Sequence, residues 1–280
     1  MTRNATTIAF IGFGEVGKRF SRDLIANEGV CIAAYDIILD DPARRPALEE
    51  AAHAIGVTCS ASAKAACQGA DIVISAVTAD KAEAVAADTA RYLTAGQIYL
   101  DVNSASPSTK KRAAAKVNAS GASYVEAAVM AAVLQPGIRV PILAGGPAAE
   151  AAAERLNKLG MNITPVASEY GRASAIKLSR SIMIKGIEAL IVDCARASRH
   201  WGVEREVYGS LGQTFPSIVW SELADKMAER VGKHGVRRAA EMREAADMLA
   251  EMGLEPGLAR AVADAQERGV RLAGKREDGR

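Results

Sequence analysis

Histidine and cysteine, two side chains that often bind metals, are scarce in this sequence of 280 residues. The three histidines, at positions 53, 200 and 234, are far apart, and no two cysteines have C-x-x-C spacing. A metal site therefore has little to build on. The four cysteines are Cys31, Cys59, Cys67 and Cys194, and Cys31 lies inside an apolar strand pattern. We expect buried, reduced thiols.

Runs of one charge and long apolar runs are also missing. The formal net charge is +2, and no lysine- or arginine-rich run is interleaved with aromatic residues, so there is no electrostatic footprint for nucleic acid. No apolar run approaches the length that spans a bilayer, and Met1 to Asn4 lead into the first strand pattern without a signal-peptide pattern. We therefore expect a cytoplasmic protein that binds small molecules and neither nucleic acid nor a membrane.

Apolar residues make up 49% of the chain, enough to bury a large core, and the length favours two domains. In the first half, strand patterns alternate with alanine-rich helical patterns, which is typical of a parallel sheet covered on both faces. The predicted strands are Thr7–Ile11, Val30–Tyr35, Val57–Cys59, Asp71–Val77, Gln97–Asp101, Ser123–Ala128, Val140–Ala144 and Met161–Val166. Helices are predicted between them at residues 16–27, 46–55, 81–92 and 108–119.

Strand patterns stop after Gly171. Residues 173–200 form one long helical stretch without proline, and a later apolar stripe at helical spacing ends at Gly253, a predicted C-terminal cap. Pro256 is predicted to begin the last helix, and His234 beside Gly235 predicts a turn between helices. We predict a doubly wound α/β domain with a mostly parallel sheet over residues 1–170. A long interdomain helix then leads into an all-α domain over residues 171–280.

A glycine-rich turn follows the first predicted strand directly. Its sequence is Gly12-Phe13-Gly14-Glu15-Val16-Gly17, a G-x-G-x-x-G pattern between a strand and a helix. The first glycine allows a tight turn, the second lets the backbone approach a pyrophosphate, and the third lets the helix pack close to the strand. The pattern predicts a Rossmann dinucleotide site formed by these six residues, and a purely structural turn is the alternative.

An acidic residue follows the second predicted strand, where a dinucleotide site needs an acceptor for ribose hydroxyls. Asp36 lies 24 positions after Gly12, and a solvated strand-end acid is the alternative interpretation. Because its carboxylate would repel a 2′-phosphate, NAD is favoured over NADP, although Arg44 and Arg45 could reach that phosphate if Asp36 turned away. We also assign three residues at or after the ends of later strands to the NAD(P) site: Val77, Thr78 and Ser104.

Three later segments, taken with the glycine turn, resemble the motifs of the β-hydroxyacid dehydrogenases, the group that contains 3-hydroxyisobutyrate and 6-phosphogluconate dehydrogenases. Residues 101–107 (DVNSASP) are similar to D-x-S-T-x-x-P, residues 126–132 (EAAVMAA) to D-A-P-V-S-G-G, and residues 171–181 (GRASAIKLSRS) to G-x-G-x-x-x-K-x-x-x-N. Residues 177–190 and 233–242 resemble a less studied subgroup whose C-terminal helical domain has no known function. The resemblance covers nearly the whole domain order and implies a homodimer built by the helical domain.

The resemblance implies that Lys177 is the catalytic acid and base. Hydride leaves a carbinol carbon only as its hydroxyl loses a proton, and hydride adds to a carbonyl only if the oxygen is stabilised and then protonated. An ammonium in a partly desolvated pocket has a lowered pKa, so it can exchange protons near neutrality. The resemblance also implies that Ser104 and the backbone of Ala128, Val129 and Met130 orient the substrate.

Departures from the family motifs put the substrate of the founding members in doubt. Met130 replaces a serine, and Ser181 replaces the asparagine four residues after the lysine. Arg180 and Lys185 lie three and eight positions after that lysine, so both project near its face of the helix. Extra cations there would favour an anionic substrate, with solvated surface charges as the alternative. His234 is a further candidate for a polar contact with the substrate, or else a helix-end residue.

These observations predict an NAD(P)-dependent oxidoreductase that acts on a small hydroxy acid or its carbonyl counterpart. An imine reductase is the near alternative, and the lysine at position 177 argues against it, because those enzymes usually place another donor at that point. A non-catalytic dinucleotide-binding sensor is the alternative from a different class of protein.

Overall fold

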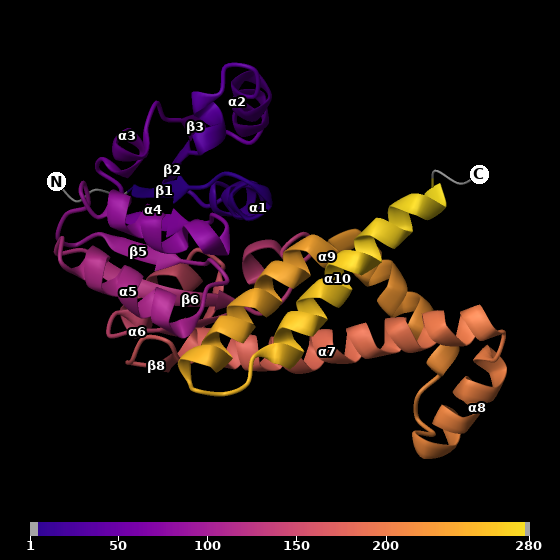
Figure 1. Ribbon diagram of the computed structural model, residues 1–280. Coiled ribbons are helices and arrows are strands. Elements are labelled where there is room, and N and C mark those ends of the chain that lie inside the picture. The colour runs from indigo at the N-terminus through magenta and orange to yellow at the C-terminus, as the bar shows by residue number, and fades with distance from the viewer. Residues whose placement is uncertain (1–4, 278–280) are drawn as a thin grey trace. The chain divides into compact units, whose positions relative to one another are not determined.

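The computed structural model describes residues 5–277, with side chains described up to residue 270. The chain separates into two compact units, Met1–Lys177 and Leu178–Arg280 (Figure 1). The strands are β1 (Thr6–Ile11), β2 (Val30–Tyr35), β3 (Thr58–Cys59), β4 (Ile72–Ser75), β5 (Ile98–Asp101), β6 (Ser123–Val129), β7 (Pro141–Gly145) and β8 (Asn162–Ala167). The α-helices are α1 (Glu15–Leu24), α2 (Arg45–His53), α3 (Ala63–Cys67), α4 (Ala82–Thr89), α5 (Pro107–Asn118), α6 (Ala149–Asn157), α7 (Arg172–Trp201), α8 (Glu204–Thr214), α9 (Trp220–Glu251) and α10 (Gly257–Glu277). Short 3₁₀ turns are η1 (Ile37–Asp40), η2 (Ala79–Lys81) and η3 (Gly137–Arg139).

The first unit is built on one sheet, whose strands lie in the order β3-β2-β1-β4-β5-β6-β7-β8. Neighbouring strands are parallel, except that β6 and β7 are antiparallel. The central strand β4 is buried at all of its residues, as expected for a strand covered on both faces. The predicted fold class, a doubly wound and mostly parallel α/β domain followed by a helical domain, is confirmed.

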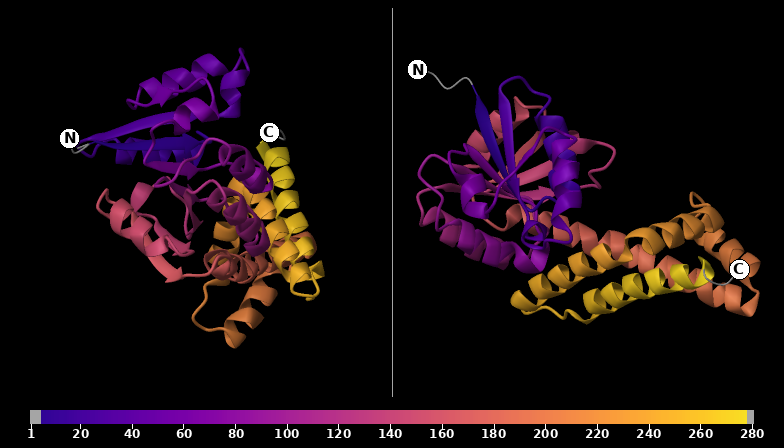
Figure 2. Two further views of the ribbon diagram at one scale, coloured as in Figure 1. Left: turned by 90° about the vertical axis from the view of Figure 1, so that its left-hand side faces the viewer. Right: turned by 90° about the horizontal axis from the view of Figure 1, so that it is seen from above.

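Helices cover both faces of this sheet (Figure 2). On one face, Phe20 of α1, Leu48 of α2 and Leu156 of α6 pack into a core with the strands. On the other face, Ala86 of α4 and Val117 of α5 belong to a second core with residues of α3. The loops after β1, β4 and β5 leave the same, carboxyl edge of the sheet, which is where ligands bind in folds of this kind.

The second unit is helical, and its last two helices, α9 and α10, pack closely. A Cβ atom on Gly235 of α9 would lie 2.3 Å from the carbonyl oxygen of Gln266 in α10, and one on Gly269 would lie 2.2 Å from Val231. The predicted turn at His234 is therefore wrong: His234 is exposed inside α9. Gly235 serves the close approach of two helices and does not break one. The predicted helix end at Gly253, where φ is +73°, is confirmed.

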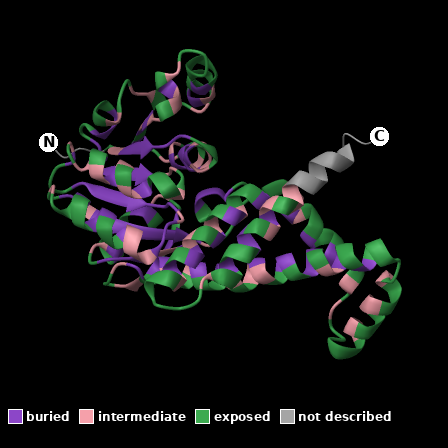
Figure 3. Cartoon of the chain, in the orientation of Figure 1, coloured by how far each residue is buried: buried purple, intermediate pink, exposed green. Residues whose placement is uncertain are grey.

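A small core joins α7 to α9 in this unit, and Tyr208 of α8 packs against it while only partly buried. Ile191, Val192 and Ala195 of α7 pack with Met227 and Val231 of α9. By contrast, α8 contains no buried residue (Figure 3). The sequence predicted neither α8 nor the short helices α3 and α6, although all eight predicted strands are present.

The expectation of buried cysteines is only partly correct. Cys67 is buried, Cys59 and Cys194 are intermediate, and Cys31 is exposed. The apolar strand around Cys31 is buried at Val30, Ile32 and Ala34, which face the core, while Cys31 points to the opposite face of β2. Across the described part of the chain, no helix combines the length and the apolar character needed to cross a bilayer.

Candidate functional site

The glycine turn after β1 leaves room for a ligand at one glycine and none at the other two. Gly12 has φ +91°, and a Cβ there would lie 2.4 Å from the carbonyl oxygen of Ala76 at the end of β4. A Cβ on Gly17 would lie 2.6 Å from the carbonyl oxygen of Gly12, so this glycine allows α1 to approach the turn. At Gly14 a Cβ would meet nothing within 4 Å. The turn is thus closely packed at Gly12 and Gly17 and open at Gly14, where a pyrophosphate would approach.

The open glycine is also the N-cap of α1, whose first residues are Glu15 and Val16. Gly14 has no side chain with which to cap the helix, and Glu15 is exposed. The first N–H groups of a helix have no partner within it and attract anions. Phe13 is buried in the core beneath the turn and contributes only its backbone. These residues therefore fit the phosphates of a dinucleotide.

Asp36 ties this turn to the end of β2. One carboxylate oxygen accepts a hydrogen bond from the Phe13 N–H at 2.7 Å, and the other accepts from the Ile38 N–H at 2.9 Å. Each carboxylate oxygen has two lone pairs, so both can still accept from a ribose hydroxyl. The two N–H groups fix the direction of the carboxylate, which the sequence could not show.

Asn103, for which we predicted no role, joins the ends of β4 and β5. Its side-chain oxygen accepts from the Val77 N–H at 2.7 Å, and its amide nitrogen donates to Ser75 Oγ at 3.0 Å. Thr78 follows in extended conformation before η2. The signal for this role was the position of Asn103 in the D-x-N-S segment, two residues after a strand-end aspartate.

A buried ion pair supports the loop that carries Ser104. Lys110 Nζ lies 2.9 Å from Asp101 Oδ1, with both side chains 1% exposed, and the ammonium also donates to the Asp101 carbonyl oxygen. Tyr124 donates its hydroxyl to the other Asp101 oxygen at 2.6 Å. Burial, and then the Asp101 carboxylate, raise the pKa of Tyr124 well above its ordinary value. The hydroxyl therefore stays protonated and keeps the loop anchored.

Lys177 and Ser104 meet in the first unit. Lys177 Nζ donates a hydrogen bond to Ser104 Oγ, and both side chains are partly buried. The lysine comes from the second turn of α7 and the serine from the loop after β5, 73 residues earlier. The structure thus brings together the predicted acid/base residue and the predicted substrate-orienting hydroxyl.

Glu126 of β6, fully buried, holds the beginning of α7. It accepts hydrogen bonds from the Gly171 N–H, from the Ser174 N–H at 2.6 Å and from the Ser174 hydroxyl. In the sequence this residue appeared only as the first letter of a motif, because its partners lie more than forty positions away. Its contacts connect the predicted substrate strand with the helix that carries Lys177.

The strand end at Ala128, Val129 and Met130 is largely occupied by sheet pairing. Ala128 and Val129 pair with Leu143 and Ile142 of the antiparallel strand β7. The Met130 N–H donates to the Pro141 carbonyl oxygen at 2.9 Å, so this donor is already engaged. A substrate held here would meet the partly buried Met130 side chain rather than that N–H group.

The remaining predicted residues lie in the helical unit. Arg180 is exposed on α7, whereas Ser181 and Lys185 are buried. Lys185 Nζ donates to Ser181 Oγ and lies 2.9 Å from Glu241 Oε2 of α9. The ammonium of Lys185 is thus already paired within this unit, and its role as an additional cation for the substrate stays a prediction.

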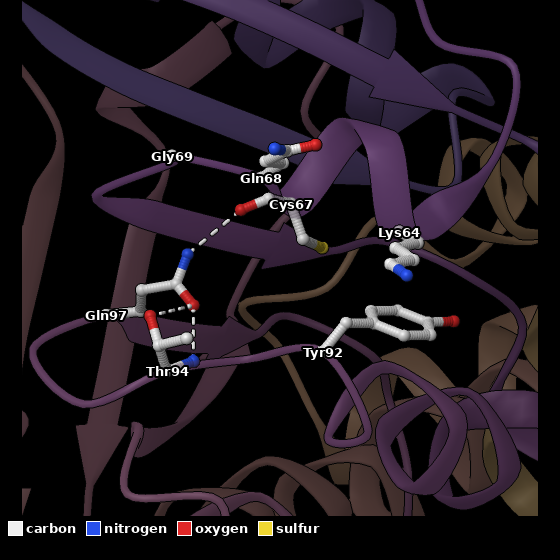
Figure 4. Close-up of a pocket in the computed structure, with 7 residues that line it drawn as sticks. All are labelled: Lys64, Cys67, Gln68, Gly69, Tyr92, Thr94 and Gln97. Atoms are coloured by element: carbon white, nitrogen blue, oxygen red, sulfur yellow. Dashed lines mark hydrogen bonds between the residues drawn. The ribbon is translucent and has the colours of Figure 1, made fainter.

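A separate pocket of about 400 Å³ lies at the opposite edge of the sheet (Figure 4). Its residues precede β4 and β5, whereas the glycine turn follows β1. The amide of Gln97 is engaged with the carbonyl oxygens of Cys67 and Ala70 and with Thr94. Burial raises the pKa of the Cys67 thiol to about 12. The pocket is lined by Lys64, Cys67, Gln68, Gly69, Tyr92, Thr94 and Gln97.

Comparison with known proteins places this geometry in a family. Residues 7–167 match the family model described as the NAD binding domain of 6-phosphogluconate dehydrogenase, and residues 198–269 match a domain of unknown function, DUF1932. The predicted resemblance, including the uncharacterised helical domain, is confirmed. A conserved hypothetical protein from Sinorhizobium meliloti 1021 is 39% identical, with a TM-score of 0.78 over 94% of this chain and 87% of that one.

Other solved structures relate the fold to hydroxyacid dehydrogenases. A conserved protein of unknown function, described as structurally similar to 3-hydroxyacid dehydrogenases, is 32% identical, with a TM-score of 0.73 over 96% of this chain and 99% of that one. The 3-hydroxyisobutyrate dehydrogenase of Mycobacterium tuberculosis, solved with L-serine, is 18% identical, with a TM-score of 0.75 over 94% and 93%. An imine reductase from Myxococcus stipitatus in complex with NADP+, 17% identical with a TM-score of 0.57 over 95% and 94%, shares the fold alone.

Proposed function

We propose that this chain, which belongs to the family of the NAD binding domain of 6-phosphogluconate dehydrogenase, is an oxidoreductase that interconverts a small hydroxy acid and its carbonyl counterpart. The observation that carries the proposal is the hydrogen bond from Lys177 to Ser104. It lies in the same unit as a glycine turn that is open at Gly14. When bound, the nicotinamide cofactor supplies or accepts the hydride.

The residues that would hold this cofactor surround the carboxyl ends of β1, β2 and β4. Gly12, Gly14 and Gly17 shape the turn, and the N–H groups at the start of α1 would bind the phosphates. Asp36 would accept hydrogen bonds from the ribose hydroxyls. Thr78 and Val77, whose N–H donates to the Asn103 side chain, would border the cofactor beyond β4.

Lys177 would hold and move the proton. As an ammonium it donates to a carbonyl oxygen and stabilises the charge that develops there, and it then protonates that oxygen. In the opposite direction the neutral amine takes the proton of the substrate hydroxyl. Ser104 accepts the Lys177 hydrogen bond and retains its own hydrogen, which it can donate to a substrate oxygen. Both directions of the reaction therefore use the same pair.

NAD is the cofactor that this chain's own residues favour. The Asp36 carboxylate is held by the Phe13 and Ile38 N–H groups, so it cannot turn away without leaving both donors unpaired. A 2′-phosphate would meet this negative charge. Arg44 and Arg45 are exposed on the chain after η1, and they would compensate only if Asp36 moved.

The substrate that we favour is small and anionic. The partly buried ammonium of Lys177 attracts a carboxylate, and the exposed Arg180 follows it by about one helical turn. Met130, in place of the smaller serine of the family motif, reduces the space beside β6. Because the fold is shared with an imine reductase, imines belong in the same test.

The experiment is a panel of 3-hydroxy acids, sugar acids, aromatic hydroxy acids, the corresponding carbonyl acids and cyclic imines, followed through NADH and NADPH absorbance. We expect turnover of at least one hydroxy acid, which Lys177→Ala slows by about 10³ without weakening NADH binding. Lys158→Ala, which removes an exposed lysine directly after α6 that is paired with Glu154, is the matched control. Turnover of imines alone would replace the proposal with imine reduction. NADH binding without any turnover would favour a sensor.

A further inference from the structure

We infer that Glu126 is a positioning residue that holds Lys177 in place for proton transfer, an inference that rests on the proposed role of Lys177. Glu126 is 0% exposed and lies in β6. Its two carboxylate oxygens receive the N–H groups of Gly171 and Ser174 and the hydroxyl of Ser174. Three donors converging on one buried carboxylate make a rigid connection between a strand and the first turn of α7.

The connection replaces the usual cap of a helix. The first N–H groups of an α-helix have no partner inside the helix and are commonly capped by a side chain that directly precedes it. Gly171, with φ +98°, has no side chain to offer. The cap comes instead from β6, 45 positions earlier in the chain. A negative charge at this end is also favourable, because the helix dipole places positive charge there.

The neighbouring strand shows that this arrangement is specific to Glu126. Asp101 lies opposite Glu126 in the register of β5 and β6 and is also buried. Asp101 forms an ion pair with Lys110 and accepts a hydrogen bond from the Tyr124 hydroxyl, and it anchors the loop after β5. Glu126 receives helix donors instead. One carboxylate therefore places Ser104, and the adjacent one places the helix that carries Lys177.

Lys177 is coupled to this anchor through one turn of helix. Ser174 and Lys177 are three residues apart, so they lie about one turn apart on neighbouring faces. Fixing the N–H and hydroxyl of Ser174 fixes the rotation and height of the turn from which Lys177 extends to Ser104. A displacement of about 1 Å of a reacting group can cost about 100-fold in rate.

The test is a double-mutant cycle with Glu126→Gln and Lys177→Ala. Glu126→Gln keeps the shape of the side chain but turns one acceptor oxygen into a donor that faces N–H groups. We expect kcat to fall about 10- to 100-fold, with an unchanged Kd for NADH. In the Lys177→Ala background, Glu126→Gln should lower the residual rate no further. A fall by the same factor in both backgrounds, or no fall in the wild type, would overturn the inference.

Amide hydrogen exchange provides a readout that does not depend on turnover. Glu126→Gln should speed exchange in residues 171–178 and leave the glycine turn unchanged, and Glu154→Gln on the exposed face of α6 is the control. If Glu126→Gln does not fold, Ser174→Ala removes only one of the three donors and should give a smaller change in the same direction. Unchanged exchange would refute the anchor. If the wild type turns over no substrate, and Glu126→Gln still exchanges faster than the wild type in residues 171–178, the proposed function is refuted and the anchor is supported.

Discussion

Two lysines eight residues apart on α7 are used in different ways. Lys177 is partly buried and donates to a serine hydroxyl in the α/β unit. Lys185 has a side chain only 7% exposed and is paired with Glu241 at 2.9 Å in the helical unit. Burial lowers the pKa of Lys185, although Glu241 acts against this shift. The comparison shows that the partners, and not the shared helix face, decide what each lysine can do.

The surroundings of Lys185 hold its side chain and backbone within the helical unit. Nearby on α7, Glu188 is 1% exposed and is paired with Arg230 and Arg238 of α9. Gln266 of α10 donates to the Lys185 carbonyl oxygen at 3.3 Å. Buried charges are tolerated only when they are paired and hydrogen-bonded. This network connects three helices and uses the charge of Lys185 within the unit.

The largest effect is expected from removing the first of these two lysines. Lys177→Met should lower the rate of hydride transfer by about 10³, because general acid–base catalysis contributes about 10² to 10⁴. Lys185→Met should change that rate far less. Single-turnover measurements of NADH absorbance with both variants check this. Equal losses in the two variants would remove the distinction between them.

The loss of unfolding free energy should be larger for Lys185→Met than for Lys177→Met, the reverse of the order expected for the rates. Lys185→Met leaves Glu241 without its ammonium in a mostly buried position, which costs about 3 kcal/mol of unfolding free energy. Lys177→Met breaks the hydrogen bond to the Ser104 hydroxyl, and it should cost less, about 1 kcal/mol. Urea unfolding followed by circular dichroism measures both. A Lys185→Met variant as stable as the wild type would show that the ion pair with Glu241 contributes nothing.

A smaller effect is expected for cofactor choice. Asp36→Asn keeps an acceptor for one of the two N–H groups but removes the charge that would repel a 2′-phosphate. The preference for NAD over NADP should fall about tenfold, equivalent to about 1.4 kcal/mol. The ratio of kcat/KM for the two cofactors measures this. A wild type that prefers NADP would contradict the assignment of Asp36.

The smallest effect concerns pH. The pKa of Lys185 is below its ordinary value of 10.5 in the folded chain, so between the two values the unfolded chain binds more protons. Its contribution to stability is therefore fully present above about pH 10.5 and is lost as pH falls through the folded pKa. The difference in unfolding free energy between wild type and Lys185→Met should grow as pH rises toward that value. A difference that shrinks over this range would contradict the direction of the shift.

Much of the fold could be predicted because its signals are local. The buried runs of β1 and β4 and the glycine turn are continuous in sequence, and the long helix α7 has no proline. The antiparallel pairing of β7 with β6 has no such local signal. Gly235 was misinterpreted as a turn, because a glycine that allows two helices to approach has the same local appearance as one that ends a helix.

The site could be predicted only in part, for a related reason. Lys177 and Ser104 belong to motifs, and the structure brings them together. Glu126 and Asn103 act through partners that are distant in sequence or belong to the backbone, so a pattern of residue types does not show them. Lys185 was predicted from its helix face alone, and its partner Glu241 lies 56 positions away. This ion pair holds the Lys185 ammonium within the helical unit, and no local pattern in the sequence shows it.

The pH dependence of kcat/KM in the wild type and in Lys177→Ala tests the central claim most directly. If Lys177 moves the proton, the wild-type profile contains a limb that reports one ionising group, and this limb is missing from the residual activity of Lys177→Ala. Lys185→Met should retain the limb. The same limb in wild type and Lys177→Ala, at comparable rates, would contradict the assignment of Lys177 as acid and base.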